Sequence, residues 1–438
     1  MKKILYSILV VLFLTNSVCI NAAEKKILFI PEQDIKKHGL DKADGNFGYE
    51  YKAESENIAL LWDKSFGKSP ETNPIIEKRF YPDEILAEAE KNFKFFVDKM
   101  KFVLKGKSYF DKYKLIIWMY NDDERTVYGG AHDKVGMTWF RPCRIDTYPY
   151  CALVHEMGHS FQFITMADGH NGFDSSMMEY TSQWMLWQLY PDWLTIENYH
   201  LNDYMKQTHL ALFHKDNMYH APQFMEYWSE KHGLKIIGEL WRKSEKGEDP
   251  VATYMRVTNI DIDEFNDEVY DAASRFVTWD LPRIKTLASS YANEHKCKLE
   301  KTNDGWYKIA KSNCPQSYGY NAIRLKVPRG GTKIKLDFKG IAGERGFVTK
   351  ETDKAGWIYG FVAVKQNGKR LYGKPNRAVN GSNETVSFIV PENTQFLWLV
   401  VTGAPTSHVA YKKDMKEVPE WPYMVKLSTE EGKSVRLW

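Results

Sequence analysis

The spacing of apolar and polar residues changes along the chain and divides it into parts. An amphipathic pattern over residues 82–104 predicts a helix among short apolar runs that predict strands. Residues 166–290 have mainly helical spacing. From about residue 295, short β-like runs are separated by Gly, Pro and Asn turns, which is typical of a β sandwich or jelly roll. The pattern predicts an α+β protein with a mixed domain at 24–292 and an all-β sandwich domain at 293–438.

Within these parts, individual runs predict particular elements. Strands are predicted at 58–62, 114–120, 136–140, 322–327, 333–337, 357–364, 386–390 and 395–401. Helices are predicted at 176–190, 222–231, 234–243, 250–257 and 262–279. Gly129-Gly130 indicates a turn. Met137-Thr138-Trp139 is our candidate for a strand at the sheet edge, where it would pair with an extended substrate.

The first 23 residues are typical of a cleaved secretory signal peptide. Lys2 and Lys3 precede an apolar run at 4–14 that is too short to span a membrane, and Asn21-Ala22-Ala23 offers a cleavage site. The alternative is a lipoprotein anchored through Cys19, although the residue before Cys19 fits that motif poorly. We therefore expect a secreted, periplasmic or cell-surface protein. No later run approaches 18 apolar residues, so no transmembrane helix is expected.

Charge and cysteine content refine this picture. The formal net charge is only +3, which gives no case for a nucleic-acid partner. Four cysteines remain after Cys19, and an even number in an exported protein favours disulfides. Of the three possible pairings we expect the local one, Cys143–Cys151 and Cys297–Cys314. Four separate buried thiols are the alternative.

The chemistry of the chain is concentrated in the run from Cys151 to Gln162. On a helix, His155 and His159 project from the same face and can hold one Zn²⁺ between them. Glu156 can reach a metal-bound water, whose pKa zinc lowers, and act as its general base. A core helix that carries two histidines without binding metal is the alternative interpretation.

Two histidines need a third protein ligand. The metzincin pattern, with a third histidine six residues after the second, is absent. Glu179 follows His159 by twenty residues, a spacing at which a second helix can supply a glutamate. Glu179 could instead complete a capping box with Ser176 at a helix start. His170 and Asp174 are reserve ligands.

A peptidase also needs a donor for the oxyanion that develops at the scissile carbonyl. The region 199–220 is rich in tyrosine and histidine. Tyr219 and His220 are our candidates within it, and Tyr180, beside the expected ligand, is a third. Each of these residues could equally be an ordinary surface or core residue of a helical subdomain.

The aromatic residues of the β domain have two interpretations. Flat aromatic side chains in exported β sandwiches can stack on sugars, which would give glycan contact through the C-terminal domain. They more often fill the core, and we expect this of Trp306, Trp357, Trp398 and Trp421.

At this point the sequence resembles a family of secreted bacterial zincin-like proteins of uncharacterised function, common in Bacteroidetes. The residues that carry the resemblance are His155-Glu-Met-Gly-His159-Ser-Phe-Gln162, Met178-Glu179-Tyr-Thr-Ser-Gln-Trp184, Tyr190-Pro-Asp-Trp193, Gly129-Gly130 with Asp133, Gly136 and Trp139, and Trp421-Pro-Tyr423. The resemblance covers roughly residues 50–430 and implies a gluzincin-type site on His155, His159 and Glu179, with Glu156 as general base. The single motif helix is also similar to that of enhancin-like, mucin-degrading zincins.

Together these features predict an exported zinc metallopeptidase that hydrolyses a protein or glycoprotein. A non-catalytic surface protein of zincin fold, binding glycan or protein, is one alternative. A metal-dependent hydrolase of a non-peptide amide or ester is another. In the first alternative the metal is structural or absent, and replacement of Glu156 by Gln leaves the function unchanged.

Overall fold

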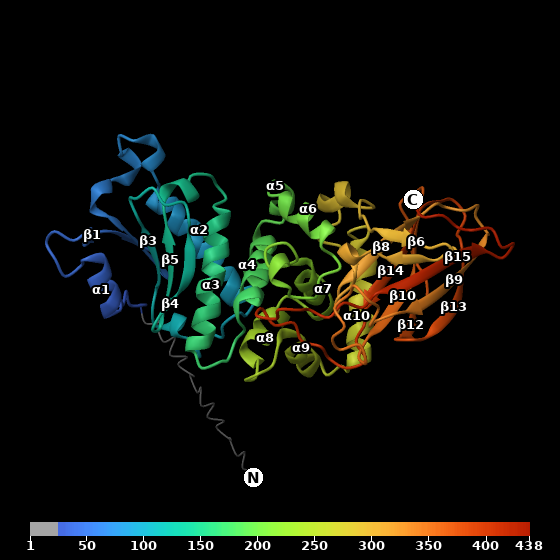
Figure 1. Cartoon of the computed structure of the whole chain (residues 1–438). Coiled ribbons are helices and arrows are strands. Elements are labelled where there is room, and N and C mark those ends of the chain that lie inside the picture. Colours follow the sequence, from blue (N-terminus) through green and yellow to red (C-terminus); the bar gives the residue numbers. More distant parts are fainter. Residues whose placement is uncertain (1–24) are drawn as a thin grey trace, which may run out of the picture.

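The computed structural model describes residues 25–438 (Figure 1). The expected signal peptide and Cys19 lie outside the described residues. A mixed sheet with helices beside it, a mainly helical middle and the β sheets of the C-terminal part follow one another along the molecule in Figure 1. Among residues 25–438, no helix has the length and apolar character needed to cross a membrane.

The first sheet is mixed and is built around three buried parallel strands. Its order is β1 (Phe47–Glu54), β2 (Ile58–Asp63), β3 (Leu115–Met119), β5 (Val135–Phe140) and β4 (Tyr128–His132). β2, β3 and β5 run parallel, and β1 and β4 are antiparallel to their neighbours. All five side chains of β3 are buried, as expected for a parallel strand covered on both faces.

Two helices of the first part pack together beside this sheet. α2 (Pro82–Lys94) starts with Pro82 in its first turn and has acidic residues at its positive end, as its sequence predicts. The helix predicted to reach residue 104 instead ends in a π-helical turn at Phe95–Lys99. α3 (Cys151–Ala167) carries the His-Glu motif and contacts both α2 and the sheet. A short helix, α1 (Glu32–His38), precedes the sheet.

The prediction that Met137-Thr138-Trp139 lies at the edge of the sheet is wrong. Residues 137–139 belong to β5, which lies inside the sheet between β3 and β4, and the edge strand is β4. Gly129 and Gly130, predicted as a turn, lie within β4. A Cβ on Gly129 would stand 1.9 Å from the carbonyl oxygen of Glu156, so the glycine permits the strand to lie against α3. The turn comes later, where Asp133 has a φ of 52°.

The middle of the chain is helical, as predicted. Its helices are α4 (Ser175–Leu189), α5 (Trp193–Ile196), α6 (Tyr199–Lys206), α7 (Gln223–His232), α8 (Ile236–Lys243), α9 (Pro250–Thr258) and α10 (Ile262–Phe276). Asp261 and Glu264 form a capping box at the start of α10, in which each side chain accepts a hydrogen bond from the backbone N–H of the other. The side chain of Asp249 caps α9. These helices connect the first sheet to the β domain.

The C-terminal part forms two β sheets. One contains β11 (Arg370–Tyr372), β10 (Gly356–Lys365), β14 (Thr394–Gly403) and β8 (Tyr320–Leu325), with β12 (Asn376–Val379) paired to β10. The other contains β13 (Asn383–Ile389), β9 (Lys333–Gly340), β15 (Tyr423–Thr429), β7 (Tyr307–Ile309) and β6 (Leu299–Lys301). The helices and the two multi-stranded regions confirm an α+β protein.

Most of the tryptophans of the β domain that were predicted to fill the core are buried. Trp357, Trp398 and Trp421 are fully buried, whereas Trp306 is half-buried. Trp357 and Trp421 pack within the apolar cluster between the two sheets. Trp398 belongs to the cluster of the helical part, because β10 and β14 also pack on α10. The helices and the first β sheet of the C-terminal part therefore share one continuous core.

The expected disulfides are wrong, because all four cysteines of the described part are free. Cys151 packs into the core at the start of α3, and burial raises the pKa of its thiol to about 12. Cys314 is buried in the apolar cluster between the β sheets, and Cys297 packs against that cluster. These thiols are used as small apolar side chains.

Candidate metal centre

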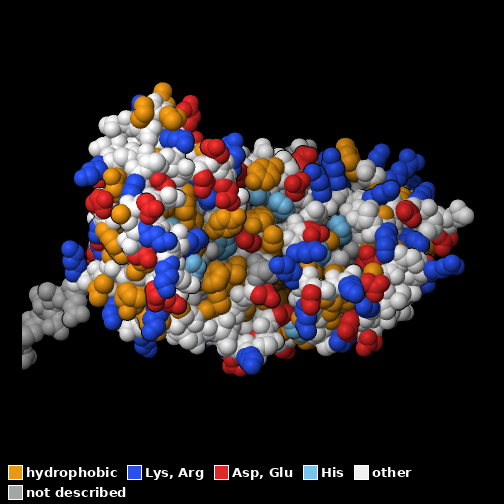
Figure 2. Space-filling model, turned by 60° about the vertical axis from the view of Figure 1, so that its left-hand side comes forward, with side chains coloured by type: hydrophobic (Ala, Val, Ile, Leu, Met, Phe, Trp, Pro, Cys, Tyr) orange, Lys and Arg blue, Asp and Glu red, His pale blue; other side chains and the backbone are white. Residues whose placement is uncertain are grey.

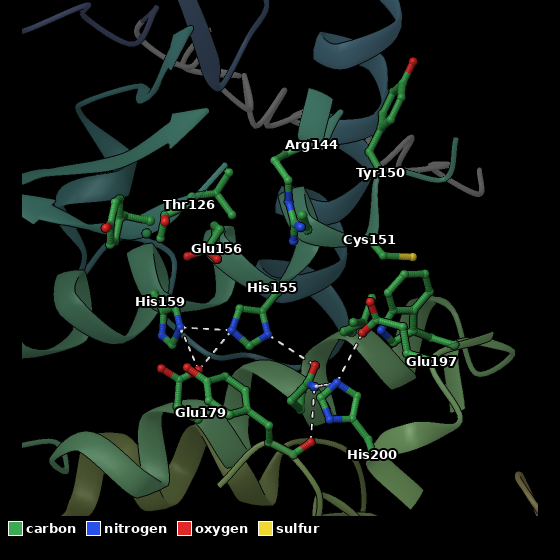
Figure 3. A pocket seen from close by; sticks show the side chains of 18 of the residues that line it. Thr126, Arg144, Tyr150, Cys151, His155, Glu156, His159, Glu179, Glu197 and His200 are labelled. Carbon is green, nitrogen blue, oxygen red and sulfur yellow. Dashed lines mark hydrogen bonds and ion pairs between the residues drawn. The ribbon is translucent and has the colours of Figure 1, made fainter. Parts of the chain in front are cut away.

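Two neighbouring helices bring three potential metal ligands together. His155 and His159 lie one turn apart on α3, and Glu179 lies on α4 (Figure 3). The Nε2 atoms of the two histidines are 3.2 Å apart. The Oε2 atom of Glu179 is 3.1 Å from His155 Nε2 and 3.3 Å from His159 Nε2. Within residues 25–438 this is the group of ligand-type side chains that could hold a metal ion.

The triangle of donor atoms has the dimensions of one face of a tetrahedral metal site. Metal–ligand bonds of about 2.0–2.1 Å at tetrahedral angles place neighbouring donors about 3.3 Å apart. The three distances from His155, His159 and Glu179 lie between 3.1 and 3.3 Å. Two nitrogens and a carboxylate oxygen leave a fourth position open, so the residues fit a catalytic type of metal site.

Gly158 explains why α4 can approach α3 closely enough to supply Glu179. A Cβ on Gly158 would meet Ser182 Oγ at 2.9 Å and Ser182 Cα at 3.3 Å. The alternative role of Glu179 in a capping box is wrong. The N-cap of α4 is Asp174, and the buried Ser176 Oγ has no hydrogen-bond partner among the described residues.

Each histidine is oriented by a glutamine amide. His155 Nδ1 lies 3.3 Å from Gln183 Oε1, and His159 Nδ1 lies 3.0 Å from Gln162 Oε1. The amide orientations are fixed because Gln183 Nε2 donates to the Tyr219 carbonyl and Gln162 Nε2 donates to the Met178 carbonyl. In the neutral form of each histidine, Nδ1–H would donate to the amide oxygen, and the lone pair of Nε2 would then be available to a metal.

The electrostatics of the metal-free site follow from the contact between carboxylate and imidazoles. Burial would raise the pKa of Glu179, but its hydrogen bonds to the two histidines outweigh burial and hold that pKa below the usual range. Burial would lower the pKa of His159, but Glu179 outweighs it and raises that pKa. A metal cation would take the place of this shared positive charge.

Glu156 lies beside the triangle and outside it. Its side chain is 8% exposed and faces the same cavity as the two histidines (Figure 3). Its carboxylate makes no hydrogen bond or ion pair with another residue of the described chain. An unpaired carboxylate next to a metal position is available to accept a proton.

The site opens into a cavity of about 1130 Å³ in the middle of the molecule. Figure 2 shows histidine side chains in a hollow of this face, with hydrophobic side chains around it. The walls come from the start of β4, the loop before α3, the helices α3 to α6 and the segment before α7, and Lys413 from the C-terminal part. Tyr128 and Tyr199, each about half exposed, stand among the lining residues.

The oxyanion candidates separate into two groups. Tyr219 lines the cavity, and its ring stacks on that of His155 with centroids 6.2 Å apart. Burial, followed by the charge of Glu179, raises the pKa of Tyr219 above its usual value. His220 also lines the cavity but contacts His200, with Nδ1 atoms 2.8 Å apart. Tyr180 is fully buried, and its hydroxyl donates to the His214 carbonyl, away from the cavity.

The reserve ligands are not part of the site. His170 lies in the loop between α3 and α4, and Asp174 is the exposed N-cap residue of α4. Neither belongs to the ligand group or lines the cavity.

Sequence reasoning missed the two glutamines and the pairing of His200. Gln162 follows His159 by three positions and Gln183 follows Glu179 by four, so helical spacing alone could have placed both beside the ligands. His200 Nε2 lies 3.2 Å from Glu197 Oε2 and 3.4 Å from Gln183 Nε2. No sequence signal links His200 to Gln183, because their contact depends on how α6 packs against α4.

Comparisons with solved structures found only distant similarity. A xylan-binding domain from CBM 22 is 9% identical and matches 32% of this chain and 80% of that domain, with a TM-score of 0.20. The C-terminal family 22 carbohydrate-binding module of Clostridium thermocellum Xyn10B is 9% identical over 32% of this chain and 79% of its own, with a TM-score of 0.19. A functionally unknown conserved protein from Bacillus anthracis str. Ames is 11% identical over 82% of this chain and 77% of its own, with a TM-score of 0.31. Scores this low carry no argument about function.

Sequence comparisons identify the family of the chain. A search of curated proteins found no significant match. The model of a family of unknown function matches residues 20–433, which is nearly the whole chain. The chain therefore belongs to DUF6055, a family of unknown function.

Proposed function

We propose that the protein is an exported zinc metallopeptidase that cleaves a protein or glycoprotein. The observation that carries this proposal is the triangle of His155, His159 and Glu179 donor atoms with the unpaired carboxylate of Glu156 beside it. Two neutral imidazole nitrogens and one carboxylate oxygen form a ligand set that zinc peptidases use. Export itself stays a prediction from the sequence.

The residues of the site support a division of roles. Zn²⁺ held by the three ligands would polarise the scissile carbonyl and acidify the attacking water. Glu156 accepts the proton of that water and passes it to the nitrogen of the leaving amine as the C–N bond breaks. Tyr219, which lines the cavity and stacks on His155, would donate the hydrogen bond of its hydroxyl to the oxyanion. His220 stands further along the cavity wall, in contact with His200.

The edge strand supports a peptide substrate over a small molecule. β4 pairs with β5 on one side only, and the residues from Thr126 to Gly129 line the cavity. An extended peptide can add to such an edge through backbone hydrogen bonds, which would lay it past Glu156. Contact between a glycan and the C-terminal β sheets stays a separate prediction.

Incubation with casein and with a mucin glycoprotein tests the proposed activity. We expect new peptide N-termini, detected by amine labelling and mass spectrometry, from the zinc-loaded protein and none after chelation with 1,10-phenanthroline. Intact substrates in both samples would contradict a peptidase acting on such proteins. They would favour the non-catalytic binding protein or the hydrolase of non-peptide amides and esters.

Substitution of Gln183 by Met is expected to weaken zinc binding about 10- to 100-fold, because His155 loses the acceptor that fixes its tautomer and ring orientation. Competition with a fluorescent chelator measures the affinity. Gln188→Met is the matched control, because Gln188 lies on the same helix and bonds to Glu226 outside the site. Equal zinc affinity in wild type and Gln183→Met would contradict the orienting role.

A further inference from the structure

Arg144 and Lys413 are the cations that line the cavity, and Arg144 is the one in the loop that leads into α3. Arg144 lies in the 3-10 turn Pro142–Arg144, seven residues before α3 begins, and its side chain reaches into the cavity (Figure 3). Within residues 25–438, its guanidinium makes no hydrogen bond and no ion pair. A guanidinium offers five donors in a planar fork that matches a carboxylate.

The loop that carries Arg144 is held in place by its neighbour Arg141. The Arg141 guanidinium donates to Asp122 at 2.7 Å, to Glu124 at 2.5 Å and to the Thr126 carbonyl at 3.0 Å. Arg141 is 6% exposed, so these bonds tie the loop to the segment that leads into β4. Arg144 therefore extends from an anchored stretch of backbone, which reduces the entropy lost when it binds a ligand.

Glu197, an acidic side chain of the same cavity, does not neutralise Arg144. Glu197 bonds to His200 Nε2 at 3.2 Å and lies outside ion-pair distance of Arg144. Burial would raise the pKa of Glu197, but its contacts with His200 outweigh burial and lower that pKa, and the charge of Arg144 adds a smaller contribution in the same direction. The space between Arg144 and Glu197 is part of the cavity that both residues line.

The direction in which a peptide binds determines which of its ends approaches Arg144. β4 and α3 run side by side in the same direction, because Gly129 packs against Glu156 and Gly130 packs near Phe163. A peptide that pairs antiparallel with β4, the more stable mode of pairing, runs opposite to both. Its C-terminal side then approaches the N-terminal end of α3, where Arg144 lies.

We propose that Arg144 binds a carboxylate on the C-terminal side of the scissile bond, and thereby selects substrates that carry one. This inference rests on the proposed peptidase function and names a substrate class for it. The carboxylate can be the free C-terminus of a short peptide or the side chain of an aspartate or glutamate. Both present the same planar pair of oxygens to the guanidinium.

A binding experiment tests this role without requiring cleavage. Zinc-loaded Glu156→Gln protein is immobilised and exposed to random decapeptides in four synthetic sets, with a free or amidated C-terminus and with or without acidic residues. Bound peptides are quantified by mass spectrometry. We expect about 10- to 100-fold enrichment of carboxylate-bearing peptides, the range for a charge-assisted bidentate contact. Enrichment within the free-acid set or within the acidic-residue set identifies the source of the carboxylate.

Variants at the same position separate recognition from general effects. Arg144→Ala is expected to abolish the enrichment while binding of amidated, non-acidic peptides is unchanged, and Arg144→Lys is expected to retain part of it. Arg329→Ala, at an exposed arginine of the β domain outside the cavity, is the matched control. Equal binding of all four peptide sets by the protein that keeps Arg144 would overturn the proposal. An equal loss of binding for all four sets in Arg144→Ala would also overturn it.

Cleavage measured on the same peptide sets keeps the two proposals distinct. If the zinc-loaded wild type cleaves no set while the Arg144-dependent enrichment persists, the peptidase proposal fails and carboxylate binding stands. If the wild type cleaves all four sets at equal kcat/KM, the selectivity fails and the peptidase proposal stands.

Discussion

Substitution of Glu156 by Gln is expected to lower kcat for peptide hydrolysis by about 10² to 10⁴, the usual contribution of a general base. Glutamine keeps the size of the side chain but cannot take a proton from water. Glu156 is outside the ligand triangle, so the zinc content is expected to stay near one equivalent per chain. Cleavage of casein, followed by the release of new amino groups, measures the rate, and elemental analysis measures the metal.

Glu197 provides the matched control for this substitution. It is a second carboxylate in the same cavity, but it pairs with His200 and does not face the ligand triangle. We expect Glu197→Gln to lower kcat far less than Glu156→Gln does. A Glu156→Gln protein that binds zinc and retains wild-type activity would contradict proton transfer by Glu156. It would leave a binding protein, or a hydrolase with another base, as the better interpretation.

The proximity of the three candidate ligands could be predicted because helical geometry connects them to the sequence. His155 and His159 are four positions apart, and this spacing fixes their common face wherever the helix packs. Glu179 needed one further assumption, namely that α4 returns alongside α3 after a short loop. The structure meets this assumption through Gly158, whose lack of a Cβ lets Ser182 approach. Gly158 lies between His155 and His159, so the stretch that carries the two histidines also determines how closely α4 packs on α3.

The edge strand could not be predicted for a related reason. Gly129 and Gly130 are also typical of a turn, and short-range rules cannot distinguish a turn glycine from one that lets two elements approach. The deciding contact is with the Glu156 carbonyl, twenty-seven positions away in the sequence. Register and strand order in the β domain depend likewise on distant partners. β15, the last strand, inserts between β9 and β7.

The disulfide prediction failed because it used only the number of cysteines and the expected compartment. An even number is compatible with bridges but contains no information about where the thiols point. The structure buries Cys151 and Cys314 among apolar side chains. The prediction would have needed the packing of α3 and of the two β sheets, which is long-range information.

Substitution of His159 by Gln is expected to reduce bound zinc from about one equivalent to less than a tenth after dialysis, because only two ligands remain. Zinc at a thousandfold excess over its dissociation constant stabilises the native state by about 4 kcal/mol. Chelation should therefore lower the Tm of the wild type by several degrees or more and leave that of His159→Gln unchanged. The metal-free wild type is expected to stay folded, because Glu179 then bridges the two imidazoles directly.

Comparing the Tm of each variant before and after chelation removes the effect of the substitution on the stability of the fold. His159 is only 8% exposed, so replacing it shifts Tm by an amount unrelated to zinc, whereas the change caused by chelation isolates the metal. His170→Gln is the matched control, because His170 lies in the loop between α3 and α4 and outside the ligand group. It should bind zinc and respond to chelation as the wild type does. Equal zinc content in His159→Gln and His170→Gln would mean that any zinc in this protein is held elsewhere, and Glu156 would then have no metal beside it.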